Sequence, residues 1–131
     1  MMKNTHLGYQ KTIDFYGCDP EKINARDFIE HALLKAAGLM KLTVINTTIH
    51  EFSPIGISGV IVIQESHIAI HTWPEHSYVA LDIFTCNQSY ALEAGILWLK
   101  EAFGATHYEE EDSKRGALKR IEAHNAMKNE N

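Results

Sequence analysis

The sequence predicts an α+β fold, in which helices pack on one face of an antiparallel sheet. Near the start of the chain, a strand-like segment, a helical segment and a second strand-like segment follow one another. A meander of short β-branched runs comes next, and a second helical segment follows it. With 131 residues, of which 45% are hydrophobic, the chain suits a single domain with one core.

The first third of the chain contains two predicted strands with a helix between them. Residues Lys11–Tyr16 alternate as a strand does, and Gly17 closes the run. Residues Asn24–Leu39 repeat apolar side chains at helical spacing, and Gly38 marks the end of that helix. Residues Leu42–Ile49 are rich in β-branched side chains, which favour a strand.

The rest of the chain contains three more predicted strands and a helix. The segment Ser53–Gly56 has the composition of a loop. The strands that we expect after it are Ile57–Ile63, His67–Thr72 and Tyr78–Thr85. Residues Ser89–Phe103 have helical spacing, and Gly104 ends that helix. From Glu109 onward the tail is charged, and we expect its last residues to be frayed.

Composition narrows the classes of partner. The formal net charge of −5 is not typical of a protein that binds nucleic acid or an anionic membrane. We expect no membrane span, because no apolar run is long enough, and no signal peptide, because the N-terminus lacks an apolar core. Cys18 and Cys86 are far apart and form no metal-type pair, which favours a reducing, cytoplasmic setting.

Titratable side chains are concentrated in one stretch, Gln64–Cys86, which reads QESHIAIHTWPEHSYVALDIFTC. The Trp73–Ser77 segment separates two strand-like runs and is typical of a hairpin connection. Paired residues would then sum to roughly 150, which places Cys86 opposite about residue 64 and beside Ser66. His71 is five residues after Ser66 and lies on the opposite face of an unbroken strand. The two can cooperate only if the chain bends near Ser66.

Each of these residues also has a structural interpretation. Ser66 could be a turn hydroxyl, His71 a core histidine, Cys86 a buried small side chain and Glu75 a solvated turn residue. A Ser-His-acid hydrolase is disfavoured, because no nucleophile-elbow glycine pattern surrounds the serine. A zinc site formed by His67, His71 and Cys86 is disfavoured, because the two histidines, four residues apart, lie on a strand and not on a helix. Composition and spacing therefore lead to a catalytic cluster without a defined reaction.

The same stretch resembles the signature of the small prokaryotic S-adenosylmethionine decarboxylases. The resemblance continues through DFYGCD near the start, HEFSPIGISGV in the middle and Lys114-Arg115-Gly116 near the end. It covers most of residues 10 to 116. It implies a two-layer α/β sandwich that assembles as a homodimer. The reaction it implies converts S-adenosylmethionine to decarboxylated S-adenosylmethionine, the aminopropyl donor for spermidine biosynthesis.

The resemblance also implies that the protein makes its own cofactor. The precursor would cleave itself between Glu65 and Ser66, giving a β chain of residues 1–65 and an α chain of residues 66–131. Ser66 would become a pyruvoyl group that binds the substrate amine as a Schiff base, with no metal and no pyridoxal phosphate. By the same matching, His71 is the processing base, Ser58 supports processing, and Cys86 donates a proton during turnover.

Substrate-binding residues follow from the same motifs. The resemblance implies that Phe52 and His71 flank the adenine and that Glu75 holds the ribose hydroxyls. The family's site lies at a dimer interface, to which the partner chain supplies the phenylalanine. Gln10-Lys11 stand where many members have His-Leu, and such departures bear on specificity.

Three alternatives stay open from the sequence. One is decarboxylation of another amino acid, such as arginine or ornithine, by the same chemistry. The acidic run Glu109–Asp112 could meet a cationic substrate, although a solvated run is the ordinary reading. The other two are a catalytically silent regulatory paralogue and a metal-binding module.

Overall fold

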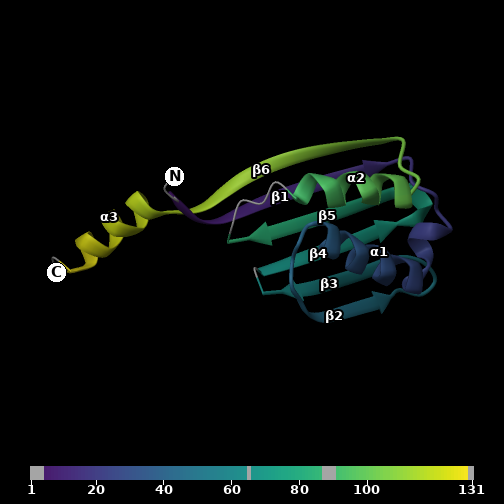
Figure 1. Ribbon diagram of the computed structural model, residues 1–131, viewed down its shortest axis with the longest axis horizontal. Coiled ribbons are helices and arrows are strands. Elements are labelled where there is room, and N and C mark those ends of the chain that lie inside the picture. Colours follow the sequence, from purple (N-terminus) through teal and green to yellow (C-terminus); the bar gives the residue numbers. More distant parts are fainter. Residues whose placement is uncertain (1–4, 65, 87–90, 130–131) are drawn as a thin grey trace.

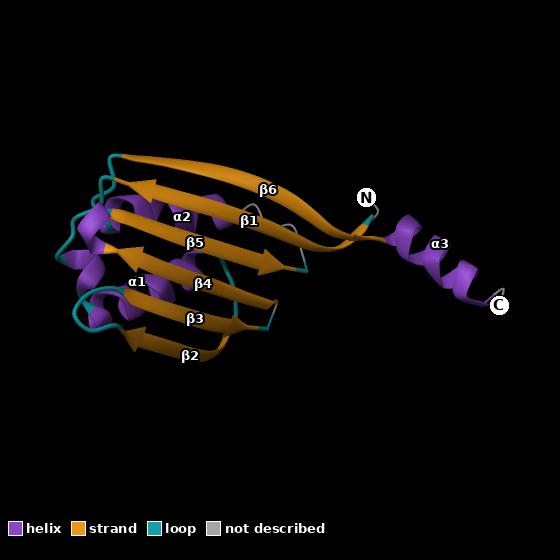
Figure 2. Cartoon of the chain, turned by 180° about the vertical axis from the view of Figure 1, so that it is seen from behind, coloured by secondary structure: helices purple, strands orange, loops and turns teal. Residues whose placement is uncertain are grey.

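A computed structural model describes residues 5–64, 66–86 and 91–129 of the chain. The fold is α+β, as predicted from the sequence. A six-stranded sheet forms one layer, and two helices lie against one of its faces (Figure 1). In the described part of the chain, no helix lies over the opposite face of the sheet, as the view from behind shows (Figure 2).

The sheet has the strand order β2-β3-β4-β5-β1-β6, and every neighbouring pair is antiparallel. The strands are β1 His6–Tyr16, β2 Val44–Glu51, β3 Ile57–Ile63, β4 Ser66–Trp73, β5 Tyr78–Thr85 and β6 His107–Ala117. The helices are α1 Arg26–Leu39, α2 Leu92–Ala102 and α3 Leu118–Asn129, with short 3-10 turns η1 Lys22–Asn24 and η2 Pro74–His76. None of the helices in these described ranges is long and apolar enough to cross a membrane.

The core lies between the sheet and the two covering helices. Strand β5 alternates buried and half-buried residues along its whole length, and β3 buries every second residue. Helix α1 buries one face against the sheet, through residues that include Ile29 and Leu33. Helix α2 comes close to α1 at Gly95, where an added Cβ would lie 2.5 Å from Met40 side-chain atoms and 3.0 Å from the Ala36 carbonyl oxygen. The glycine is therefore needed for the close approach of the two helices.

The segments predicted from hydrophobic pattern agree with the structure, and the charged tail does not. Strands β3 and β5 have the predicted bounds, and β1 begins five residues earlier than expected. The tail forms strand β6 and helix α3, whereas the sequence indicated only a charged segment from Glu109 with frayed last residues. β6 is polar along nearly its whole length, so its strand conformation depends on pairing with β1 from His6 to Tyr16. Local pattern does not reveal that pairing.

The β1–β6 ribbon extends past the rest of the sheet. Pairing of β1 with β5 ends at Tyr9 and Thr85, whereas pairing with β6 continues to His6 and Ala117. Helix α3 follows directly and projects away from the body (Figure 1). We call residues 113–129 the arm.

Candidate active site

The β4–β5 hairpin carries most of the predicted site residues. Its two strands are joined by η2 and by Ser77, which has a φ of 50°. Register partners run from Trp73 and Tyr78 to Ser66 and Thr85, which differs by one residue from the register predicted from the sequence. Cys86 directly follows Thr85, so the hairpin does bring the thiol to the end of the strand where Ser66 lies. The thiol is free and exposed.

Ser66 begins β4 in an unfavourable backbone conformation. Its φ is 153°, which is positive for a residue with a side chain. Ile63 and Ser66 are register partners, so only two residues, Gln64 and Glu65, connect β3 to β4. Such two-residue connections favour Gly, Asn or Asp, and neither residue here is of that type. Glu65 itself lies outside the described residues. Strain of this kind is common where a backbone takes part in chemistry.

The hydroxyl of Ser66 lies close to one histidine of the stretch, and that histidine is His67. Ser66 Oγ is 3.4 Å from His67 Nδ1. The His67 ring is stacked on Phe84, with ring centroids 5.8 Å apart and an interplanar angle of 10°. The residue expected from the sequence to act with Ser66 was His71.

His71 is instead held by Ser58. The two residues are register partners on β4 and β3, and Ser58 Oγ lies 2.9 Å from His71 Nδ1. His71 is exposed on the uncovered face of the sheet. A hydroxyl bonded to one ring nitrogen orients the imidazole and leaves its Nε2 for a reacting group.

Within one chain, His71 and Ser66 do not converge. Strand β4 keeps regular pairing with both neighbours from Ser66 to Trp73, so the bend that convergence required is absent. Five residues of extended strand separate the two by about 16 Å, so they lie at different ends of β4.

Phe52 and Glu75 lie at the His71 end of the sheet. Phe52 follows β2, is 50% exposed, and its backbone N–H donates to the Gly56 carbonyl at 2.8 Å. The register of β2, β3 and β4 brings this turn beside Thr72, and a Cβ on Gly56 would be 3.4 Å from the Thr72 carbonyl oxygen. Glu75 is exposed on η2, which closes the same end. The predicted residues therefore form two groups, Ser66 with Cys86 at one end, and Ser58, His71, Phe52 and Glu75 at the other.

Comparison with known proteins gives the chain a family. Residues 9–116 match the model of the S-adenosylmethionine decarboxylase family. The chain belongs to that family. The S-adenosylmethionine decarboxylase proenzyme of Acidithiobacillus ferrooxidans is 46% identical over 112 residues, which cover 86% of this chain and 84% of the relative. The proenzyme of Clostridium kluyveri is 39% identical over 115 residues, or 88% of this chain and 91% of the relative.

Solved structures agree with this assignment. The crystal structure of the adenosylmethionine decarboxylase from Aquifex aeolicus is similar with a TM-score of 0.78 and 30% identity, and the match covers 86% of this chain and 93% of that one. The Trypanosoma brucei AdoMetDC monomer matches with a TM-score of 0.55 at 14% identity, a likeness of fold that covers 78% of this chain and 44% of the other.

In this member of the family, the uncovered face also carries an aromatic cluster that sequence reasoning missed. Tyr78 stacks between Trp73, at 5.4 Å between ring centroids, and Tyr16, at 5.7 Å. The Tyr78 hydroxyl donates to Asp14. Burial, followed by that hydrogen bond, raises the pKa of Tyr78 above its ordinary value, so the phenol stays protonated. Alternation along the three strands β1, β4 and β5 was the signal that could have placed these rings on one face.

Lys11, one of the departures from the family pattern, occupies the helix side of the sheet. Its ammonium group is 2.6 Å from Glu110, 3.0 Å from Asp112 and 3.6 Å from Glu93. Burial lowers the pKa of Lys11, but hydrogen bonds to Glu110 and Asp112 outweigh it, and the pKa is raised overall. Glu110 and Asp112 of the acidic run Glu109–Asp112 are thus bound to Lys11 within the chain.

The zinc alternative required His67, His71 and Cys86 to meet. Among the residues with described positions, no three His, Cys, Asp or Glu side chains gather as metal ligands.

Proposed function

We propose that this chain is a self-processing, pyruvoyl-dependent decarboxylase of S-adenosylmethionine. The observation that carries the proposal is the backbone of Ser66. It sits in a strained conformation directly after a tight connection, at the same end of the sheet as the exposed Cys86, in a chain of this family. The relatives are named as proenzymes, which is consistent with a precursor that cleaves itself.

Self-cleavage follows from the chemistry of a serine at that position. Ser66 Oγ forms a bond to the carbonyl carbon of Glu65, the peptide C–N bond breaks, and the hydroxyl proton passes to the freed nitrogen. Removal of the Ser66 α-proton then expels the Glu65 carboxylate. Hydrolysis of the remaining enamine releases ammonia and leaves a pyruvoyl group on the chain that begins at position 66. The β chain is residues 1–65 and the α chain residues 66–131.

The residues assigned to the site suit a pyruvoyl group at position 66. When formed, it supplies a ketone that draws electrons away from the carbon losing carbon dioxide. The Cys86 thiol, one residue beyond the register partner of position 66, gives a proton to the product α-carbon. Phe52 contacts the adenine, and the Glu75 carboxylate accepts hydrogen bonds from the ribose hydroxyls.

A complete site requires two chains. Within one chain the Ser58–His71 pair lies at the end of β4 opposite to Ser66, so it does not reach the α-proton that must be removed. Two chains that pack their uncovered sheet faces in opposite directions bring the Ser66 end of each over the His71 end of the other. That face exposes Val60, Val62 and Trp73 by about two-fifths each, as an apolar surface for a homodimer. Phe52 and Glu75 then also come from the chain that supplies His71.

Intact-mass measurement tests the processing step. Wild-type protein should give two fragments, with the 66–131 fragment lighter than its serine-initiated mass by one ammonia. Ser66→Ala should stay uncleaved. Cys86→Ala should cleave normally but release carbon dioxide at least about tenfold more slowly, because the proton donor is lost. A single uncleaved mass for the wild type after long incubation contradicts the proposal.

The substrate is tested separately, by carbon dioxide release from S-adenosylmethionine, arginine and ornithine. We expect turnover of S-adenosylmethionine alone. Cleaved protein that releases carbon dioxide faster from arginine or ornithine assigns the same chemistry to another amino acid. Cleaved protein that is inactive on all three supports the silent paralogue.

A further inference from the structure

Strand β6 forms one edge of the sheet and has an unusual distribution of charge. On its inner side it pairs with β1 from His107 to Ala117, and in the described part of the chain no strand pairs with its outer side. Its sequence runs Glu109-Glu110-Glu111-Asp112-Ser113-Lys114-Arg115, four acidic residues followed by two basic ones. Edge strands commonly carry scattered charges that prevent pairing, but here the two signs are separated around one serine.

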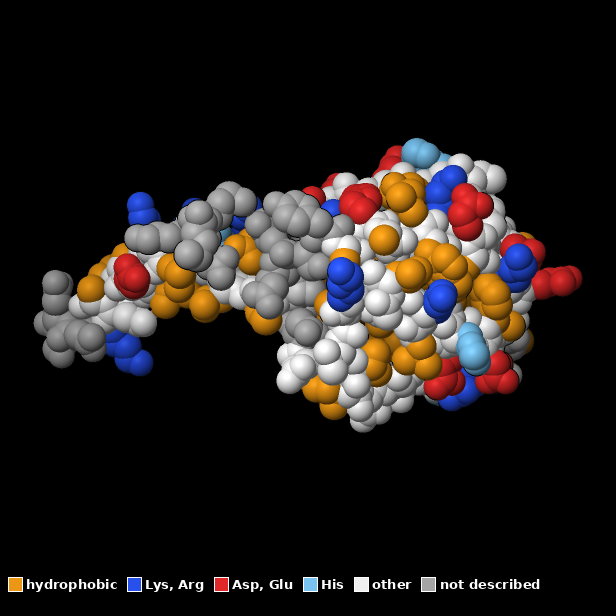
Figure 3. Space-filling model, viewed as in Figure 1, with side chains coloured by type: hydrophobic (Ala, Val, Ile, Leu, Met, Phe, Trp, Pro, Cys, Tyr) orange, Lys and Arg blue, Asp and Glu red, His pale blue; other side chains and the backbone are white. Residues whose placement is uncertain are grey.

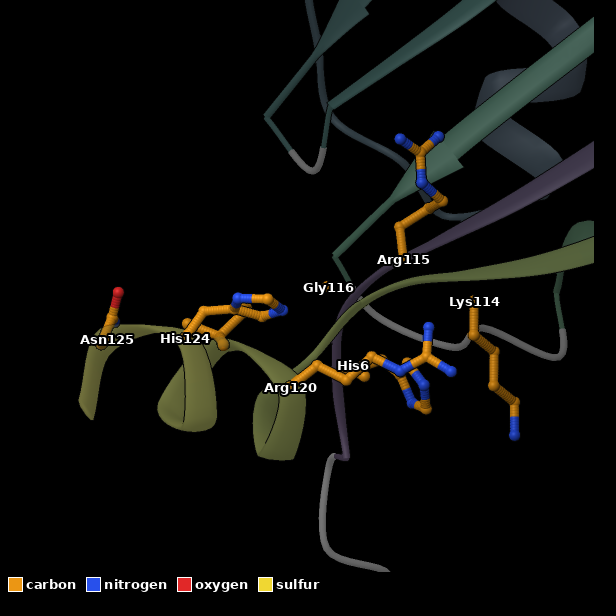
Figure 4. Close-up of a pocket in the computed structure, with 9 residues that line it drawn as sticks. His6, Lys114, Arg115, Gly116, Arg120, His124 and Asn125 are labelled. Atoms are coloured by element: carbon orange, nitrogen blue, oxygen red, sulfur yellow. The ribbon is translucent and has the colours of Figure 1, made fainter. Parts of the chain in front are cut away.

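The basic half of β6 continues into the cationic arm. Residues 113–131 contain five Lys or Arg and two Glu, a net charge of +3. Residues 1–112 contain seven Lys or Arg and fifteen Asp or Glu, a net charge of −8. A pocket on the arm is lined by basic groups that include His6, Lys114, Arg115, Arg120 and His124 (Figure 4). Figure 3 shows the arm carrying Lys and Arg side chains away from the body.

We propose that β6 pairs antiparallel with β6 of a second copy of this chain, around a two-fold axis at Ser113. In this register Glu111 lies opposite Arg115 of the other copy, and Asp112 lies opposite Lys114. Opposed residues in an antiparallel pair share a face of the sheet, and both pairs satisfy that condition. The two-fold axis generates each of these pairs twice, so four contacts between opposite charges form along the edge. The basic pocket of each arm then lies along the acidic run of the other copy.

Exposure of the carboxylates selects this register over the neighbouring one. A shift by two residues opposes Glu110 to Lys114 and Glu109 to Arg115. Both Glu110 and Asp112 contact Lys11, at 2.6 and 3.0 Å, but the Glu110 side chain is only 21% exposed whereas the Asp112 side chain is 71% exposed and can also meet a group on a second chain. Glu109 already lies 3.4 Å from His107. Glu111 is exposed, and it is the carboxylate that the proposed axis pairs with Arg115.

A second copy suits this edge better than a polyanion does. Four carboxylates lie on the same strand as the basic pocket and would repel nucleic acid. Self-complementary order, acidic then basic about a centre, is what an isologous interface requires. The edge contact differs from the face-to-face homodimer and uses another surface, so it does not depend on the proposed decarboxylase activity.

Charge reversal tests the edge contact. We would measure molecular mass by sedimentation at about 0.05 M and about 0.5 M salt, with chain cleavage followed in parallel by intact mass. Glu111→Arg and Arg115→Glu should each place like charges in opposition twice, raise the dissociation constant of the largest assembly about tenfold or more, and halve its mass. The double variant Glu111→Arg/Arg115→Glu should restore the assembly. Cleavage should stay at the wild-type level in all three.

Two controls limit the interpretation. Glu101→Lys on α2 changes the same net charge away from β6 and should leave the mass unchanged. Glu109→Lys tests the register, because it should weaken assembly much less than Glu111→Arg does. Single reversals that leave the mass unchanged, a double variant that stays dissociated, or wild-type binding to an oligonucleotide that is lost in Arg115→Glu without a change in mass would overturn the inference.

Discussion

At the scale of single residues, the two thiols of this chain have opposite environments. Cys18 is 2% exposed, and burial raises its pKa to about 11. The Cys86 thiol is exposed at the end of β5. A buried thiol with a raised pKa is unreactive near neutral pH, because the thiolate is the nucleophile. Cys18 therefore contributes packing, and Cys86 is the thiol that is accessible for the proposed proton transfer.

Alkylation with iodoacetamide should separate the two thiols. In the folded protein at neutral pH we expect rapid labelling of Cys86 and protection of Cys18, with both labelled in urea. Because the folded-state pKa of Cys18 is raised, its contribution to stability is complete below the unfolded-state value and is lost as pH rises toward 11. Cys18→Ala should flatten the loss of unfolding free energy between about pH 9 and pH 11. Equal labelling of both thiols in the folded state would contradict this assignment.

At the scale of elements, the accuracy of the sequence predictions followed the apolar pattern. Every second residue of β3 and of β5 is buried, and the bounds of both strands were predicted correctly. β6 has no such pattern, so its sequence did not predict a strand. One of its carboxylates, Glu110, is instead bound by Lys11 of β1, which is 99 residues away in the sequence. The contact between α1 and α2 likewise depends on a glycine whose role is visible only when both helices are placed.

The two helical glycines offer a matched test of that contact. Gly95→Ala should lower the free energy of unfolding by about 1–3 kcal/mol, because the added methyl meets Met40 and the Ala36 carbonyl. Gly38→Ala in α1 has nothing within 4 Å of its added methyl. It should raise the free energy of unfolding by about 0.5–1 kcal/mol through helix propensity. Urea denaturation of both variants gives the comparison, and equal effects would show that helix packing does not distinguish the sites.

At the scale of the whole molecule, the proposed function makes the assembly part of the chemistry, because the predicted site residues lie at both ends of β4. Ser66 and Cys86 belong to one end of the sheet, and Ser58 and His71 to the other. A chain that lacks His71 would keep a competent Ser66 if its partner supplied the histidine. Single variants at the two positions should therefore complement each other.

Co-expression of Ser66→Ala with His71→Ala tests this directly. Each variant alone should remain uncleaved. In mixed dimers the His71→Ala chain should be cleaved, because its Ser66 meets His71 of the other chain, whereas the Ser66→Ala chain should stay intact. Distinct affinity tags on the two chains make each product identifiable by mass. Absence of cleavage in isolated mixed dimers would place Ser66 and His71 of the same chain together and contradict the composite site.

The sequence by itself determined the local features of this protein: the hairpin that brings Cys86 to the Ser66 end of the sheet, and the alternation that decides which residues of β4 share a face with His71. Both follow from short-range geometry, namely a tight turn and a side-chain period of two residues. Only the tertiary structure decided that β4 stays straight, that one face of the sheet stays uncovered, and that the charged tail becomes the edge strand β6. These features arise from pairing between distant segments, and no local pattern encodes which distant strand will satisfy a backbone or a charge.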